Sequence, residues 1–145
     1  MLDLSFAIGH HLLVFGLFGV LAAELIAVRR GMDQPAVARV AAVDLWYGIL
    51  AGLILVVGVG RAILAAKGWA YYSHNSFFWA KMATFAVVGL LSAPPTVAYI
   101  RWKRAGVAPT DAQVAGVRRF LVAEAVLFAL LPAFAAAMAR GYGQF

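Results

Sequence analysis

The feature of this sequence that most limits its fold is a set of four long apolar segments. They cover about residues 4–28, 43–65, 77–100 and 119–139. Each approaches or exceeds the ~20 residues that an α-helix needs to cross a hydrocarbon core of about 30 Å. A transmembrane barrel would instead require short strands of alternating hydrophobicity. The sequence therefore predicts an all-α fold, an integral membrane four-helix bundle, built as a single four-span transmembrane domain over residues 1–145.

Composition supports a membrane protein. Hydrophobic residues make up 65% of the chain and the mean hydropathy is +0.90, whereas soluble domains are about 45–50% apolar. The chain has no cysteine, which excludes disulfides, thiolate-held clusters and the C-x-x-C-H attachment of c-type haem. The first basic residue is Arg29. A signal peptide needs a basic stretch ahead of its apolar part, so we expect residues 4–28 to be a permanent span.

The basic residues are distributed unevenly among the linkers. The net charge is +6, and eight of the twelve Lys and Arg residues lie in the linkers 29–42 and 101–119. The linker 66–76 holds only Lys67, and the two ends of the chain hold only Arg140. By the positive-inside rule both basic linkers are cytoplasmic, so both termini lie outside. This distribution favours membrane topology and contact with anionic lipid over binding to nucleic acid.

Local signals indicate where the helices begin and bend. Asp33 can cap the second helix, and Thr110 with Gln113 has the spacing of a capping box. The second and fourth helices are therefore expected to begin in the cytoplasm, ahead of their apolar parts. Pro94 and Pro95 lie inside the third span, where each removes an amide donor and predicts a kink.

Seven ionisable residues fall within the spans or at their ends. Each is expensive in a membrane and needs a partner, water or a ligand. With both termini outside, the three carboxylates lie toward the cytoplasmic end, near the arginines of the basic linkers, and charge pairing with those arginines is expected. The histidines and the two cations lie toward the outer end. The seven are His10, His11, Glu24, Asp44, Arg61, Lys81 and Glu124.

The outer group has two cations but only Asp3 nearby to neutralise them. Long basic side chains can snorkel to the interface, or they can hold an anionic ligand. Haem b suits the second alternative, since its iron accepts imidazole, its two propionates attract cations, and bundle cores commonly hold it. The second axial ligand stays open among His74, Met82, Met138 or no protein ligand.

The residues predicted to bind this cofactor are His10, His11, Arg61 and Lys81. Either histidine could be the metal ligand. His10 is 14 residues from Glu24, so the two share a helix face, and His10 points into the bundle if Glu24 does. His11 is rotated by about 100° from His10. This favours His10 as the iron ligand, with His11 as the competitor.

The segments "DLWYGILAGLILVVGVGR", "KGWAYYSHNSFFWAKMATFAVVGLLSAPPTVAYIRW" and "GHH" resemble a family of bacterial inner-membrane proteins of unknown function. That family distantly resembles the HemJ-type protoporphyrinogen oxidases and the copper-resistance CopD membrane proteins. The HemJ resemblance implies four spans and bound haem b. A first-span histidine and a third-span lysine would match His10 or His11 and Lys81. The HemJ pattern of Trp and Gly after the histidine is replaced here by "LLVFGLFGV", so haem binding carries over more directly than the oxidase reaction.

Three functions are compatible with these features. The first is a haem-dependent oxidoreductase of the bacterial inner membrane, which acts in electron transfer or in HemJ-like porphyrinogen oxidation with a quinone as partner. The second is CopD-like copper or other metal handling, with His10, His11 and His74 as imidazole ligands. The third is an accessory or assembly subunit of a membrane complex. The expected partners are lipid, a quinone or porphyrin, or another membrane subunit, and the sequence leaves open a homo-oligomer.

Overall fold

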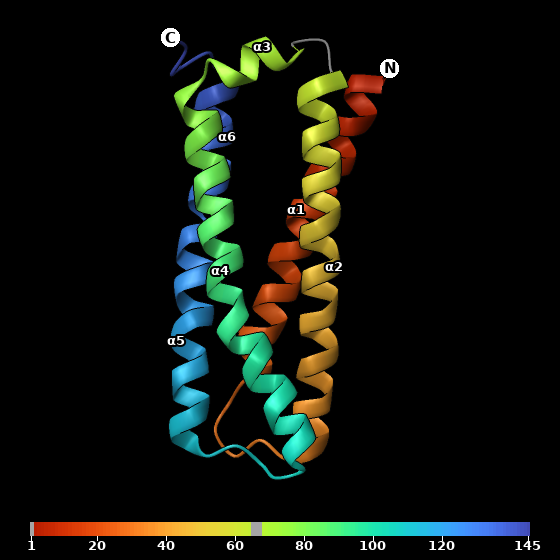
Figure 1. Ribbon diagram of the computed structural model, residues 1–145, viewed down its shortest axis with the longest axis vertical. Coiled ribbons are helices and arrows are strands. Elements are labelled where there is room, and N and C mark those ends of the chain that lie inside the picture. Colours follow the sequence, from red (N-terminus) through yellow and green to blue (C-terminus); the bar gives the residue numbers. More distant parts are fainter. Residues whose placement is uncertain (1, 65–67) are drawn as a thin grey trace.

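The computed structural model describes residues 2–64 and 68–145, and this part of the chain is helical with no strand (Figure 1). The all-α prediction is confirmed. Lys67 lies outside the described residues, as does the side chain of Asp3. The helices are α1 (Leu2–Ala27), α2 (Gln34–Leu64), α3 (Gly68–Ser73), α4 (Ser76–Ala105), α5 (Asp111–Phe128) and α6 (Leu130–Ala139).

Four stretches of this fold are long and apolar enough to cross a membrane, which confirms the four predicted spans. They are Leu4–Ala27, Gln34–Leu64, Ser76–Ala105 and Asp111–Ala139. The last span consists of α5 and α6. The interruption between them precedes Pro132, whose ring lacks an amide hydrogen and crowds the carbonyl four residues back.

Both ends of the chain and α3 lie at one end of the bundle, and the two basic linkers lie at the other (Figure 1). We call these the outer end and the inner end, following the charge rule. The orientation in the membrane remains a prediction from that rule.

The predicted helix-start signals are present at the inner end. Asp33 Oδ1 accepts a hydrogen bond of 2.8 Å from the amide of Ala36. Thr110 and Gln113 form the reciprocal capping box at the start of α5. Both helices therefore begin in the inner linkers, ahead of their apolar parts, as expected.

Helix α4 continues through its two prolines. Ser92 Oγ donates to the carbonyl of Gly89 at 2.7 Å, and Thr96 Oγ1 donates to the carbonyl of Ser92 at 3.1 Å. The carbonyls that lose an amide partner to the prolines are those of Leu90 and Leu91, four residues back, so these two hydroxyls bond other carbonyls of the same turns. The outer half of α4 runs alongside α6, and its inner end lies beside α2 (Figure 1).

The bundle has a buried seam and an apolar outer surface. α1 packs along α2, while α4 packs against α5 and α6. The seam includes Leu17, Leu21, Tyr99 and Leu121, each at most 1% exposed. Many large apolar side chains point outward, where the bilayer covers them. Examples are Leu12, Phe15, Ile26, Val56 and Leu90.

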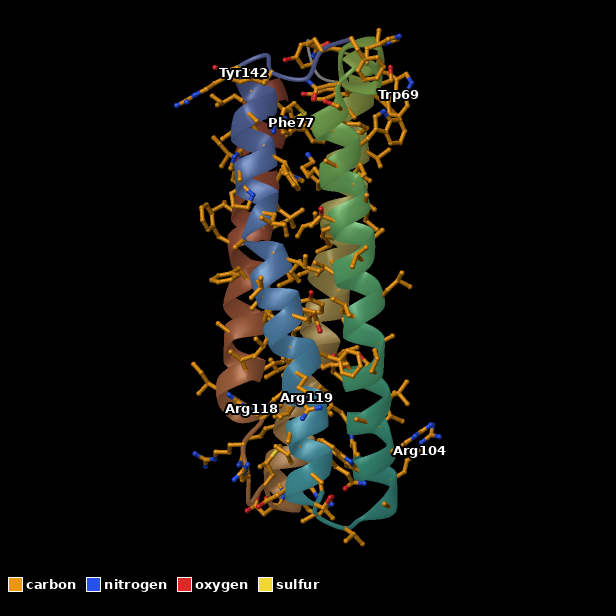
Figure 2. The ribbon with its side chains drawn as sticks, turned by 90° about the vertical axis from the view of Figure 1, so that its left-hand side faces the viewer. Trp69, Phe77, Arg104, Arg118, Arg119 and Tyr142 are labelled. Carbon is orange, nitrogen blue, oxygen red and sulfur yellow. The ribbon has the colours of Figure 1, made fainter. Side chains whose placement is uncertain are left out.

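The outer end is closed by residues 140–145, which fold back onto the start of α4. The fully buried Asn75 caps α4 and also donates to the carbonyl of Tyr142 at 2.9 Å. The amide of Phe145 donates to the carbonyl of His74 at 3.1 Å. Trp69 and Tyr142 lie at this end (Figure 2), as expected for aromatic residues at a membrane interface.

Candidate functional site

His10, Arg61 and Lys81 form a cluster in the outer half of the bundle, which we call the outer cationic site. They come from three helices, α1, α2 and α4 respectively. Electrostatic interactions connect His10 with both cations, and connect the two cations with each other. The fold therefore brings together three of the four residues that the sequence predicted for the cofactor.

The His10 imidazole lies against a glycine of the neighbouring helix. A Cβ atom added at Gly58 would lie 3.3 Å from His10 Cε1 and 3.7 Å from its Nδ1. The glycine therefore provides the space that the ring occupies. His10 Nδ1 is buried and has no hydrogen-bond partner among the described residues. A buried polar nitrogen of this kind is costly unless a ligand or a proton partner satisfies it.

His11 takes a different position from its neighbour. Its side chain is exposed, and its Nδ1 bonds the carbonyl of Ala7, one turn earlier, at 2.6 Å. The two histidine rings meet edge to face with centroids 6.3 Å apart. Helical rotation explains the difference, since successive residues are separated by about 100°.

The other residues considered as ligands lie near the outer end. His74 is exposed, and its Nδ1 bonds the carbonyl of Ala70 at 2.9 Å. Met82 and Met138 are partly buried against the apolar cluster that contains Tyr72. Within the described part of the chain, no three His, Cys, Asp or Glu side chains are arranged to hold a metal ion.

Lys81 is half-buried, and its side chain reaches an aromatic ring. Its Nζ lies 5.8 Å from the centre of the Phe78 ring, which is within the range of a cation–π contact. The carboxylates whose side chains the structure describes belong to the inner half or the inner linkers. These are Glu24, Asp33, Asp44, Asp111 and Glu124. Two cations beside one imidazole attract negative charge, so an anionic ligand would suit the outer cationic site.

The residues present at the outer cationic site fit haem b by the nature of their donors. His10 offers an imidazole nitrogen that lacks a partner, and iron accepts such a donor. Arg61 and Lys81 offer two cations close to that ring, and the group carries two propionates.

The inner half holds a second group, which we call the carboxylate cluster: Glu24 of α1, Asp44 of α2 and Glu124 of α5. Their side chains are 2%, 9% and 1% exposed. Electrostatic interactions connect all three with one another. Three like charges gathered in an apolar bundle repel one another, so this arrangement needs a physical explanation.

Hydroxyl groups supply the hydrogen bonds of the carboxylate cluster. Thr96 Oγ1 donates to Asp44 Oδ1 at 2.8 Å. Tyr99 Oη donates to Glu24 Oε2 at 3.4 Å. The hydroxyl of Tyr47 donates to the carboxylate of Glu124.

The expected pairing of these carboxylates with linker arginines is wrong. Arg118 Nη1 instead donates to the carbonyl of Leu25 at 2.7 Å and to the carbonyl of Val28. These carbonyls lie at the end of α1, where the helix supplies no amide partner. Among the described residues, no Lys or Arg side chain acts on the three carboxylates.

Several residues of both sites were missed from the sequence, although spacing could have found some of them. Tyr47 follows Asp44 by three residues, and Tyr99 follows Thr96 by three. Residues three apart lie on the same face of a helix. No spacing rule would have paired Gly58 with a ring on another helix.

The match to known families agrees with this architecture. A family model described as "Predicted membrane protein (DUF2214)" covers residues 2–143. The chain belongs to the DUF2214 family. No curated protein and no solved structure is detectably similar to this DUF2214 protein.

Proposed function

We propose that this DUF2214 protein binds haem b at the outer cationic site and acts in electron transfer in the bacterial inner membrane. His10 would be the iron ligand, and Arg61 and Lys81 would hold the propionates. One observation supports the proposal most directly: His10 has a buried nitrogen without a partner, beside two cations. A single ligand that combines an imidazole-binding centre with anionic groups would bind all three side chains.

The contacts of the two histidines support different roles for them. His11 is already bonded to its own helix and is exposed, whereas His10 faces α2 and has no such bond. His10 is therefore the better ligand. Copper handling by His10, His11 and His74 has less support, because the three imidazoles do not converge within the described residues.

Haem would supply one-electron transfer at this site. The chain itself would orient the group through His10 and neutralise its carboxylates through the two cations. The apolar walls of the outer half would exclude water. The HemJ resemblance of His10 and Lys81 supports a porphyrinogen as electron donor and a quinone as acceptor.

The test is an absorption spectrum of protein made with ample haem and purified in detergent, both oxidised and reduced. We expect a Soret band in the wild type, and its loss in His10→Ala. His11→Ala is the matched control and should keep the band. Arg61→Ala and Lys81→Ala should lower the haem content while the iron ligand remains.

Two results would overturn the proposal. A wild-type protein without a Soret band excludes haem binding. A His11→Ala protein that loses the band, while His10→Ala keeps it, excludes His10 as the ligand.

A further inference from the structure

No Lys or Arg in the described part of the chain acts on the carboxylate cluster of Glu24, Asp44 and Glu124. The three side chains come from three helices and are at least nine-tenths buried. Each ionised carboxylate inside an apolar bundle would lose the solvation of water. Each would also repel the other two at short range. Arg118, on the same helix as Glu124, is engaged with the carbonyls of Leu25 and Val28 at the end of α1.

Two carboxylate oxygens in the cluster give an independent sign of a missing ligand. Glu24 Oε1 and Glu124 Oε1 are buried and have no hydrogen-bond partner among the described residues. Their side chains are only 2% and 1% exposed, so bulk water does not solvate them. Buried polar atoms are normally satisfied. Binding of a proton would neutralise the carboxylate, so that its unpaired oxygen would no longer carry a buried negative charge.

Asp44 is the member of the cluster that reaches the surface of the bundle. It is the most exposed of the three carboxylates, at 9%, and it lines an open groove with Tyr47 of α2 and Ser92 and Thr96 of α4. Three hydroxyls line the same groove as Asp44, and that of Thr96 donates to its carboxylate. Hydroxyls both donate and accept hydrogen bonds, so they can conduct a proton between water and a carboxylate.

The depth of Asp44 is compatible with access from the inner surface. α2 has 31 residues, which makes it about 46 Å long, against a hydrocarbon core of about 30 Å. With α2 centred in the membrane, about 8 Å would extend beyond the core at each end. Asp44 is ten residues from the start of α2, or ~15 Å, so it lies roughly 7 Å inside the core.

We propose that the carboxylate cluster is a proton-binding site, in which Glu24 and Glu124 hold exchangeable protons and Asp44 passes them to and from water at the inner end. In each uptake a carboxylate oxygen binds one proton from water and becomes a neutral carboxylic acid, and release reverses this. The facing groups are Tyr47 from α2, and Thr96 and Tyr99 from α4. The site does not depend on haem.

Protons suit this cluster better than a metal ion. The described residues contain no group of three carboxylates or imidazoles whose arrangement could hold a metal. One oxygen of Asp44 and one of Glu24 already accept hydroxyl hydrogen bonds. Hard cations such as Mg²⁺ and Ca²⁺ prefer six or more oxygen ligands, and this cluster does not offer such a shell.

The experiment is infrared spectroscopy of the full-length protein in lipid at neutral pH, in H₂O and D₂O. We expect the carbonyl band of protonated carboxyl groups, shifted by deuteration. Glu24→Gln and Glu124→Gln should each remove about half of this band, since each neutral amide replaces one of two protonated acids. Asp111→Asn is the control, because Asp111 is exposed at the start of α5 and should leave the band unchanged.

The wild-type spectrum decides the question even if a variant fails to fold. Absence of the band at neutral pH, with all carboxylates ionised, would overturn the proposal. A band that disappears when sodium replaces choline in the buffer would assign the cluster to a metal cation instead, and so would also overturn it. A band unaffected by sodium, and lost reversibly when the pH is raised, supports the proton assignment.

Discussion

Arg118 provides a sharp test of how the inner end is held together. Its Nη1 bonds two carbonyls at the end of α1, those of Leu25 and Val28. A hydrogen bond from a charged donor contributes about 1.5–3 kcal/mol. Both bonds use the same nitrogen, so their contributions are not expected to add in full. We therefore expect Arg118→Ala to lower the free energy of unfolding by about 2–3 kcal/mol, which is less than two independent bonds of this kind would contribute.

The adjacent Arg119 is the matched control. The two side chains follow each other on α5 (Figure 2), but Arg119 is exposed and Arg118 is only partly so. For a chain of this size, 1 kcal/mol changes the melting temperature by about 4 °C. Thermal unfolding in detergent should therefore show a fall of roughly 8–12 °C for Arg118→Ala, and almost none for Arg119→Ala. Equal melting temperatures for the two variants would refute the helix-end role of Arg118.

Three further predictions test other parts of the fold. Gly58→Val should displace the His10 imidazole and so lower the haem content of the purified protein. Gly52→Val is the control and should keep its haem, because a Cβ added at Gly52 meets nothing within 4 Å. Equal haem content in the two variants would contradict the contact between Gly58 and His10. Tyr99→Phe should reduce stability by about 1 kcal/mol in denaturant titrations, since one buried hydroxyl bond is lost; an unchanged midpoint would argue against that bond. Reporter fusions after Ala105 should report the cytoplasm and those after Ser73 the periplasm, and the reverse pattern would invert the assignment of the two ends.

The sequence predicted the architecture well because membrane helices obey strong local rules. Apolar length located the four spans, and short capping signals such as Asp33 and Thr110 located helix starts at the inner end. The break before Pro132 was not predicted. Its cause is local, a proline within the last apolar segment, but periodicity and hydropathy do not distinguish a bent span from an interrupted one.

The candidate sites were only partly predictable. Helical rotation correctly separated the inward His10 from the exposed His11, because the geometry of one helix is enough for that distinction. The partners of the inner carboxylates were predicted wrongly. Proximity along the membrane normal suggested arginine, yet the rotation of α5 turns Arg118 toward α1 carbonyls while Glu124 faces hydroxyls. Which partner a side chain contacts depends here on how the helices pack against one another, and no local pattern in the sequence reports that packing.

The fold-back of residues 140–145 has a consequence for the order of assembly. These residues leave the ribosome after all four spans have been synthesised. Until then Asn75, which caps α4, lacks the Tyr142 carbonyl that its amide group bonds in the finished protein. The third span therefore enters the membrane with the Asn75 oxygen able to cap α4 through the amides of Phe77 and Phe78, but with the Asn75 amide group not yet bonded to the end of the chain. In the final step of biogenesis residues 140–145 bind to the start of α4 at the outer end, and this joins the start of the third span to the end of the fourth.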